Sequence, residues 1–521
     1  MQVVDSPPLS PPVVPTPDGV SPSPSCIPPN HPVRTLVLCF DGTGDQFDAD
    51  NSNVVQLFSM LKKDDRRQQM VYYQAGIGTY VTPQVATPLA AKISKTLDEA
   101  IAWNLHAHVM GGYEFLMQNY EAGDKICIFG FSRGAYTARA LAGMIHKVGL
   151  LPACNHQQVP FAYKMYTDTS ATGWAQSTAF KKAFSMDVDI EFIGVWDTVC
   201  SVGLASRRLP FTASNTSVKT FRHAVSLDER RAKFKANLFN WPRKDETELG
   251  THPGDMPKAG QDSDMGLFRG AGEVKSVQEA EKAGDKRKGG SSVLSRFSNL
   301  SRKSSVDDRQ RQRDMERQFS QQEKTTLETD VLEVWFSGCH CDVGGGSVSN
   351  DTRHSLARIP LRWMIRQCFL ANTGIRFHAE LLRGAGLDPG ALHPAVRERP
   401  PALFLSPSPS VPTPDATPER RLSEEEEDLA DALCPVYDQL ARARGWWALE
   451  LLPMRHRVQR ADGRWETEVY PNMGRAREVP RQGAHPVYVH RTVKVRVEAE
   501  KARGRVYAPR ARFEVEPTWV A

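Results

Sequence analysis

The sequence predicts an α/β protein in which helices cover both faces of a mostly parallel central sheet. Short apolar runs of the kind found in buried strands alternate along the chain with segments whose apolar residues recur at helical spacing. One of these apolar runs turns through Gly130-Phe131-Ser132-Arg133-Gly134 directly into a helical pattern. Because strands covered on both faces are apolar throughout their length, these two observations favour a parallel sheet between two helical layers.

The predicted elements begin at Arg34 and follow one another as strand and helix. We expect strands at residues 35–40, 70–73, 125–129, 190–196 and 332–336. The helix after the first strand presents on one face Val54, Leu57, Phe58 and Leu61. A second helix, over residues 135–147, follows the third strand, and Gly149 and Pro152 end it.

Composition divides the chain into ordered and disordered parts. Residues 1–33 are rich in Pro and Ser and are predicted to form a disordered tail. Residues 34–370 form the predicted main domain. The charged, Ser-rich stretch 241–328 interrupts it as a disordered insertion that could accept phosphate. Residues 371–428 are predicted to be a variable linker region, with a low-complexity stretch at 406–427.

The last part of the chain, residues 429–521, is predicted to form a lobe that packs back onto the main domain. We expect a helix over Leu429 to Arg444, and Trp446 and Trp447 as the anchoring side chains. Two further stretches, EVYPNMG (468–474) and TVKVRVE (492–498), have a strand-like pattern.

Charge and cysteine usage limit the partners and the compartment. The 521 residues carry 66 Lys and Arg against 61 Asp and Glu, which is too balanced to indicate a nucleic-acid partner. Nine cysteines without regular spacing favour free thiols in a reducing compartment. No signal pattern and no bilayer-length apolar run occur, so we expect a cytoplasmic protein without an integral membrane segment. Peripheral membrane contact is compatible with this, and the oligomeric state is left open.

We expect no metal and no other cofactor. Cys339, His340 and Cys341 are adjacent residues, and adjacent side chains on a strand point to opposite faces of the sheet. The sequence contains no second ligand pair at the spacing typical of a zinc site.

Ser132 is the candidate nucleophile. A strand, the sequence Gly-x-Ser-x-Gly and a helix together form a nucleophile elbow, a turn so tight that the positions two before and two after the serine must be nearly free of side chain. The serine hydroxyl is then exposed at the top of the sheet, beside a helix N-terminus. The alternative is a structural serine in an ordinary strand-to-helix turn.

A nucleophilic serine needs a base and a residue that orients the base. In α/β-hydrolase topology these follow in the order nucleophile, acid, histidine, at the ends of different strands. Asp197 ends one apolar strand, and His340 follows another after a glycine. Taken alone, Asp197 could cap a turn with Thr198 and His340 could be a loop histidine bound to backbone. The rival bases, in order of preference, are His354, from a polar loop, and then His223, His106 and His108, from helix-like segments.

The oxyanion hole is predicted to use the backbone N–H of Arg133 and amides of Gly42 and Thr43, in the turn 41–44. Asp41 and the Arg133 side chain are candidate substrate contacts, although Arg133 could instead pair with a nearby acid. The motif around Asp41 also resembles that of haloacid-dehalogenase-type phosphatases. Their chemistry requires an aspartate two residues earlier, where this sequence has Cys39, which disfavours that alternative.

Several motifs together resemble an uncharacterised α/β-hydrolase family related to the type VI secretion phospholipase effectors, with a type-one-like catalytic domain. They span residues 34 to 370 and comprise CFDGTGD (39–45), YYQAGIGT (72–79), IFGFSRGAYTARALAGMI (128–145), GVWDTV (194–199) and FSGCHCDVGGG (336–346). The resemblance implies an α/β-hydrolase core with Ser132 as nucleophile, Asp197 as acid and His340 as base. Asp342 is then expected to shape the turn.

The resemblance also implies hydrolysis of a carboxylic ester on a lipid, because the bacterial effectors of this family are phospholipases. The sequence departs from that context, since it shows no secretion-associated segment and no membrane-insertion module. Its Pro/Ser-rich tails and its charged insertion are similar to those of fungal cytosolic members. The alternative function is a non-enzymatic interaction protein that recruits partners through its disordered segments.

Overall fold

The computed structural model describes residues 24–77, 90–199, 209–213, 215, 217–239, 329–405, 421–459, 465–480 and 485–521. The predictions for most of the N-terminal tail, for the insertion at 241–328 and for much of the linker at 406–427 lie outside these residues.

A single eight-stranded sheet forms the centre of the described structure, and each of its strand pairs is parallel. The predicted α/β class is therefore confirmed. The strands run in the order β12-β11-β7-β6-β5-β4-β2-β3. Their bounds are β2 (Thr35–Phe40), β3 (Gln69–Gln74), β4 (Lys125–Phe131), β5 (Ile190–Trp196), β6 (Val218–Ser226), β7 (Asp330–Phe336), β11 (Tyr488–His490) and β12 (Thr518–Val520).

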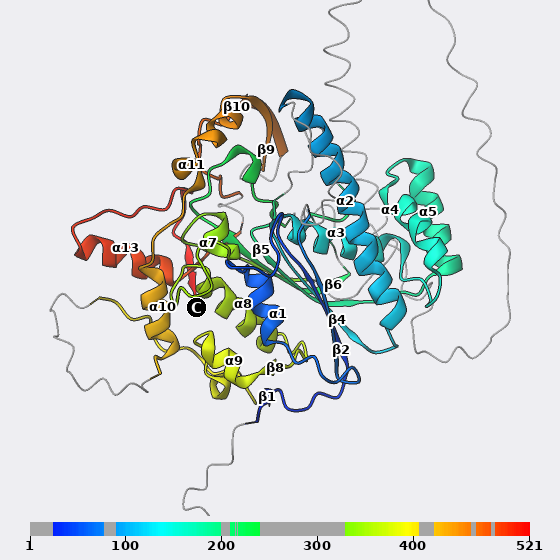
Figure 1. Cartoon of the computed structure of the whole chain (residues 1–521), viewed down its shortest axis with the longest axis horizontal. Helices are drawn as coiled ribbons and strands as arrows, with labels where there is room; N and C mark the ends of the chain where they lie inside the picture. The colour runs from blue at the N-terminus through cyan, green and yellow to red at the C-terminus, as the bar shows by residue number, and fades with distance from the viewer. Residues whose placement is uncertain are drawn as a thin grey trace, which may run out of the picture.

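Helices cover both faces of this sheet (Figure 1). On one face, alternate residues of β2 and β4 such as Leu36 and Ile128 pack with α2 (Ala90–Asn119), α3 (Ser132–Val148), α4 (Val159–Thr167) and α5 (Ala171–Phe184). On the other face, the intervening residues such as Val37 and Phe129 pack with α1 (Asn53–Met60) and α8 (Arg358–Leu370). Because successive strand residues point to opposite faces, a fully apolar strand contributes to both cores.

Smaller elements complete the described structure. The short strand β1 (Cys26–Ile27) pairs antiparallel with β8 (Phe377–His378), so order begins before Arg34, contrary to the predicted boundary of the tail. A second antiparallel pair consists of β9 (Pro453–Gln459) and β10 (Trp465–Pro471), which includes part of the predicted strand EVYPNMG. Besides the helices of the C-terminal segment described below, the short helices include α7 (His340–Gly344), α9 (Ala379–Gly384), α12 (Trp447–Glu450), η1 (His156–Gln158), η2 (Ala232–Phe234), η4 (Pro389–Ala391) and η5 (Arg444–Trp446).

The structure corrects the prediction that His223 belongs to a surface helix. It lies in β6, where its side chain is fully buried. The polar residues of this strand suggested exposure, but they have hydrogen-bond partners from distant parts of the chain. Arg222 donates to Gln367 (2.7 Å), and His223 Nδ1 lies 2.8 Å from Glu333 Oε1.

The C-terminal part of the chain is built into the sheet, since β11 pairs directly with β7 and β12 pairs with β11. The stretch TVKVRVE, predicted to be strand-like, begins helix α13 (Thr492–Ala502). Its buried positions include residues 492, 495, 496 and 499, which have helical spacing. The helix-favouring residues AEKA (499–502) that follow extend it.

The predicted helix over 429–444 is replaced by two shorter helices, α10 (Glu424–Ala432) and α11 (Gln439–Arg442). Pro435 lies between them and lacks the N–H that a continuous helix would need. The acidic run that was included in the linker forms the first turn of α10, where Ser423 and Glu426 make a capping box. Negative charge is favourable at that end of a helix.

Trp446 and Trp447 differ in their contacts. Trp446 packs edge-on against Phe234 of the main domain, with ring centroids 5.5 Å apart, as expected of an anchor. Trp447 is 36% exposed and donates its indole N–H to the carbonyl of Leu440, within its own segment. Among the described helices, none is long and apolar enough to cross a bilayer.

Candidate active site

The chain turns sharply from β4 into α3 at Ser132, where the nucleophile elbow is predicted. Ser132 has a φ of 58°, in the left-handed region that residues with side chains rarely occupy. A Cβ on Gly130 would lie 2.5 Å from the Gly134 carbonyl oxygen, and a Cβ on Gly134 would lie 2.3 Å from the carbonyl oxygens of Phe40 and Asp41. The backbone therefore passes too closely at both positions for any residue other than glycine.

Ser132, His340 and Asp197 lie in a hydrogen-bonded row. His340 Nε2 is 2.8 Å from Ser132 Oγ, and His340 Nδ1 is 2.6 Å from Asp197 Oδ2. Each residue directly follows the carboxyl end of a strand or the short turn after it, namely β4 for Ser132, β5 for Asp197 and β7 for His340. Because parallel strands end at the same edge of a sheet, residues distant in sequence meet there.

Asp197 directly follows β5, and residues of the adjacent strand β6 hold it in place. Its backbone N–H donates to Ala224 (2.7 Å), and the next amide, that of Thr198, donates to His223 Nε2 (3.0 Å). The carboxylate accepts the backbone N–H of Ser226 at 2.9 Å and two bonds from Arg477. Burial would raise the pKa of Asp197, but the Arg477 guanidinium and the His340 hydrogen bond hold it well below its usual value. The carboxyl group is therefore ionised.

His340 begins the short helix α7 after a glycine turn. Gly338 has a φ of 105°, and a Cβ there would lie 2.4 Å from that of Asp342. The imidazole packs between Phe131 and Phe234, with ring centroids at 4.7 and 4.8 Å. Burial lowers the pKa of His340, and the bond to Asp197 offsets this only in part. The ring is therefore neutral at pH 7, as a general base must be.

Asp342 shapes the turn around His340, as the resemblance implied. Its carboxylate accepts the backbone N–H of Cys339 (2.8 Å) and of Tyr437 (2.9 Å) and the hydroxyl of Ser347 (3.1 Å). Burial raises the pKa of Asp342 to about 6. Its partners are on the turn itself and on the C-terminal segment, and it makes no bond to His340 Nδ1 or Nε2.

The turn 41–44 lies against the elbow, since the Arg133 guanidinium donates to Thr43 Oγ1 at 3.1 Å. Asp41, however, is buried and accepts bonds from Ser52 Oγ (2.6 Å), Tyr73 Oη (2.7 Å) and the Gly42 amide (2.8 Å).

These contacts disfavour two predictions. The Asp41 carboxylate is occupied by protein donors, so it organises the turn and does not suit a direct substrate contact. The Gly42 amide already donates to Asp41, which makes it a poor oxyanion donor. The use of the Thr43 and Arg133 backbone amides as oxyanion donors remains a prediction.

The rival histidines have other partners. His223 holds the loop after β5, as described above. His354 Nδ1 lies 3.1 Å from Asp431 of α10. Together with Glu427 these two residues are the one group among the described residues with metal-ligand spacing. Arg353 and Arg358 pair with its carboxylates, so the charge there is already balanced within the protein. His106 lies in α2 beside the ring of Tyr163, and His108 belongs to the same helix.

Sequence reasoning missed Arg477 and Phe234. Arg477 lies in a charged stretch after β10 that carries no motif, and only the folded chain shows that its guanidinium is buried against Asp197. Phe234 belongs to the three-residue helix η2, too short to give a periodic signal. Neither residue could have been selected from residue type and spacing alone.

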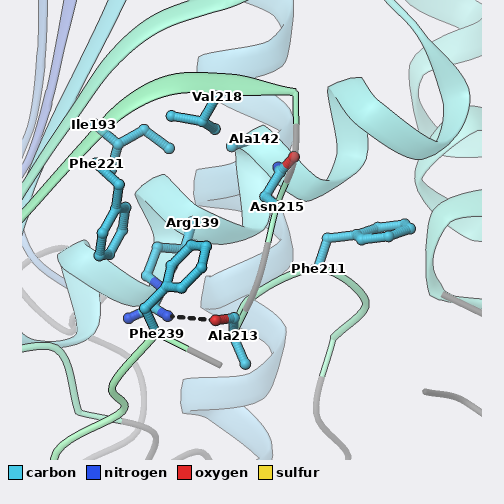
Figure 2. Close-up of a pocket in the computed structure, with 9 residues that line it drawn as sticks. All are labelled: Arg139, Ala142, Ile193, Phe211, Ala213, Asn215, Val218, Phe221 and Phe239. Carbon is cyan, nitrogen blue, oxygen red and sulfur yellow. Dashed lines mark hydrogen bonds between the residues drawn. The ribbon is translucent and has the colours of Figure 1, made fainter. Parts of the chain in front are cut away.

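A small pocket lies apart from these residues, on the face of the sheet covered by α3. Figure 2 shows it between Arg139 and Ala142 of α3, Ile193 of β5 and Phe221 of β6. The Arg139 guanidinium donates to the backbone carbonyl of Ala213 at 3.3 Å. None of the lining residues belongs to the Ser132–His340–Asp197 row.

The parallel sheet and the contacts at its edge define the class of the protein as an α/β protein in which a serine, a histidine and an aspartate are joined by hydrogen bonds. A model of the family described as "T6SS, Phospholipase effector Tle1-like, catalytic domain" matches residues 34–367, more than half of the chain. The chain belongs to this family. Arg477 lies beyond the matched residues.

The chain is also similar to a protein of baker's yeast. The uncharacterized protein YEL023C of Saccharomyces cerevisiae is 30% identical over 411 residues, which cover 69% of this chain and 58% of the relative. The chain thus spans less than two thirds of that relative's length.

Two solved structures share partial similarity. An uncharacterized protein from Pseudomonas aeruginosa aligns over 69% of this chain and 48% of its own, with 16% identity and a TM-score of 0.32. The Tle1 effector bound to the VgrG spike of the type 6 secretion system aligns over 39% of this chain and 48% of its own, with 18% identity and a TM-score of 0.24. These TM-scores are too low to indicate a shared overall arrangement.

Proposed function

We propose that the protein is a serine hydrolase that cleaves a carboxylic ester of a lipid through an acyl-enzyme. The observation that carries this proposal is the row of contacts from Ser132 Oγ through the imidazole of His340 to Asp197, at 2.8 and 2.6 Å. A nucleophile, a base and an orienting acid at these distances are the groups that acyl transfer requires.

Acylation begins when Ser132 Oγ attacks the ester carbonyl carbon. The hydroxyl proton passes to His340 Nε2, and the electron pair of the carbonyl bond moves onto its oxygen. The backbone amides of Arg133 and Thr43 stabilise that oxyanion. Asp197 keeps the proton on Nδ1 and stabilises the imidazolium. When the oxyanion collapses, the bond to the alcohol breaks and the alcohol takes the proton from Nε2.

Deacylation repeats these steps with water as the nucleophile. His340 removes a proton from the water, which attacks the acyl carbon, and Ser132 leaves with the proton that Nε2 held. The products are a carboxylic acid and the free enzyme. No step requires a group from outside the chain other than water.

The substrate class rests on the family, whose description names phospholipase effectors. A glycerophospholipid is therefore the first substrate class to test, followed by neutral acylglycerols and short acyl esters. The Arg133 side chain, beside Thr43 at the elbow, is suited to contact the phosphate of such a substrate.

The test compares the wild-type chain with Ser132→Ala in a screen of these three classes. The variant should lose activity on the order of 10⁶-fold in kcat while its thermal unfolding midpoint stays close to wild type, because only one oxygen is removed. Hydrolysis at wild-type rates by the variant would contradict the proposal.

Labelling with a fluorophosphonate separates an enzyme from an interaction protein of the same shape. The probe should modify Ser132 in the wild type, and the modification should be lost in His340→Ala. Folded wild-type protein that takes up no label would favour the interaction protein.

A further inference from the structure

The guanidinium of Arg477 donates hydrogen bonds to Asp197, Ser226 and Phe234. Nη1 donates to Asp197 Oδ1 at 2.5 Å, and Nη2 donates to Oδ2 at 2.9 Å, so that both carboxylate oxygens are held by one planar group. Nη1 also donates to Ser226 Oγ (2.8 Å), and Nε donates to the Phe234 carbonyl (3.0 Å).

These bonds fix the direction of the carboxylate. Oδ1 accepts Arg477 Nη1 and the Ser226 amide, and Oδ2 accepts Arg477 Nη2 and His340 Nδ1. Asp197 is fully buried, so an unpaired charge there would be strongly disfavoured. Arg477 supplies the balancing charge and also the geometry that turns Oδ2 toward the imidazole.

The segment that carries Arg477 also supports the other side of His340. Glu450 Oε1 accepts the backbone N–H of Ala232 at 2.6 Å, and Asn472 donates to the Arg230 carbonyl at 2.8 Å. These contacts hold the loop that places Phe234 against the His340 ring.

We infer that Arg477 is a positioning residue of the active site, which keeps Asp197 ionised and aligned with His340. The inference rests on the proposed function. The inference adds that residues 34–367, which match the family, do not complete the site by themselves. The arginine that pairs with Asp197 lies beyond them, at position 477.

The inference makes a prediction about protonation. The positive guanidinium disfavours an additional proton on the Asp197–His340 pair. Without the guanidinium, the Asp197–His340 pair should bind the additional proton at a higher pH. The pH midpoint of the acidic limb of activity should therefore rise. Removing an opposite charge at this distance shifts a pKa by roughly one to three units.

The experiment measures the rate of fluorophosphonate labelling of Ser132 against pH in the full chain. Arg477→Met should raise the midpoint of the acidic limb by about one pH unit or more, since its side chain has similar length and no charge. Arg477→Lys should restore the midpoint but label more slowly than wild type, because an ammonium cannot make the paired bonds.

Arg496→Met is the matched control. Arg496 is also a buried arginine of the C-terminal segment, but it donates to the carbonyls of Ala432 and Cys434. This variant should lose thermal stability, as Arg477→Met does, with the pH midpoint of labelling unchanged.

The outcomes distinguish this inference from the proposed function. Wild-type protein that is never labelled would overturn both. Labelled wild type with an unshifted midpoint in Arg477→Met would overturn this inference alone. If Arg477→Met does not fold, Arg477→Lys tests the inference in its place. Labelling of Arg477→Lys at wild-type rates at every pH would overturn the inference, because it would show that the paired bonds are not needed.

Discussion

At the scale of residues, the site depends on two titratable groups that are buried side by side. Asp197 stays ionised in spite of burial, because Arg477 and His340 both favour its charge. His340 stays neutral, because burial disfavours its charge more than Asp197 favours it. These are the protonation states that the proposed general-base catalysis requires at neutral pH.

This pairing predicts where activity is lost on acidification. Burial lowers the pKa of His340 below its ordinary value of 6.5, so the ring is neutral above the lowered pKa and takes a proton as the pH falls through it. The acidic limb of kcat/KM for the wild type should therefore have its midpoint below pH 6.5. A pH profile on a neutral ester measures this midpoint, and a value clearly above 6.5 would contradict the assignment of His340 as the base.

Sequence reasoning could select the three residues of the hydrogen-bonded row because each carries a local signal. Ser132 is part of a motif, and Asp197 and His340 follow apolar runs. The residues that hold them carry no such signal. Arg477 lies 280 positions from Asp197 along the chain, and its role depends on which charged side chains become buried, which spacing does not reveal.

At the scale of elements, the elbow shows why its two glycines are needed. The strand β4 and the helix α3 meet at Ser132 without an intervening loop, and the helix begins three residues earlier than the apolar spacing predicted. The strained backbone at Ser132 is maintained by close packing of Gly134 against the end of β2.

Gly134→Ala tests this packing. The added methyl group would meet the carbonyl oxygens of Phe40 and Asp41 at 2.3 Å, so the backbone must move. We expect a loss of about 1–3 kcal/mol in the free energy of unfolding, measured in urea, together with slower labelling of Ser132. The control is Gly384→Ala at the end of α9, where an added Cβ meets nothing within 4 Å. Equal stability of the two variants would contradict the argument.

Helices and strands at the C-terminal end were the least predictable elements. The strands β11 and β12 have three residues each, which is too short for a periodic signal. The Val-rich start of α13 has the alternation typical of a strand. Its helical state follows from packing against α10, and a single sequence does not show that partner.

At the scale of the whole molecule, the chain folds back so that its last strands extend the sheet formed by its first. The C-terminal lobe, which was expected to pack back onto the main domain, contributes two strands to the same sheet, since β11 lies between β7 and β12. The candidate site accordingly combines Ser132, Asp197 and His340 with Arg477 from a much later segment of the chain.

Val489→Asp tests whether these parts form one cooperative unit. Val489 of β11 is fully buried, and an unpaired carboxylate there should destabilise the entire sheet by several kcal/mol. Thermal unfolding followed by circular dichroism and by Ser132 labelling should show both signals lost at the same lowered temperature. Val506→Asp, at a position that is 94% exposed, is the control. Normal labelling in a Val489→Asp chain whose C-terminal segment is digested by protease would show separate units.

The short outer strand β12 has a consequence for self-association. A long, flat outer strand offers a row of unpaired backbone groups on which a second molecule can add its own strand, which is how many aggregates and fibrils begin. In this structure the edge strand β12 is three residues long, so it offers a neighbouring molecule only a few unpaired backbone groups. A protein whose sheet ends in this way should tolerate high concentration with little tendency to polymerise along that edge.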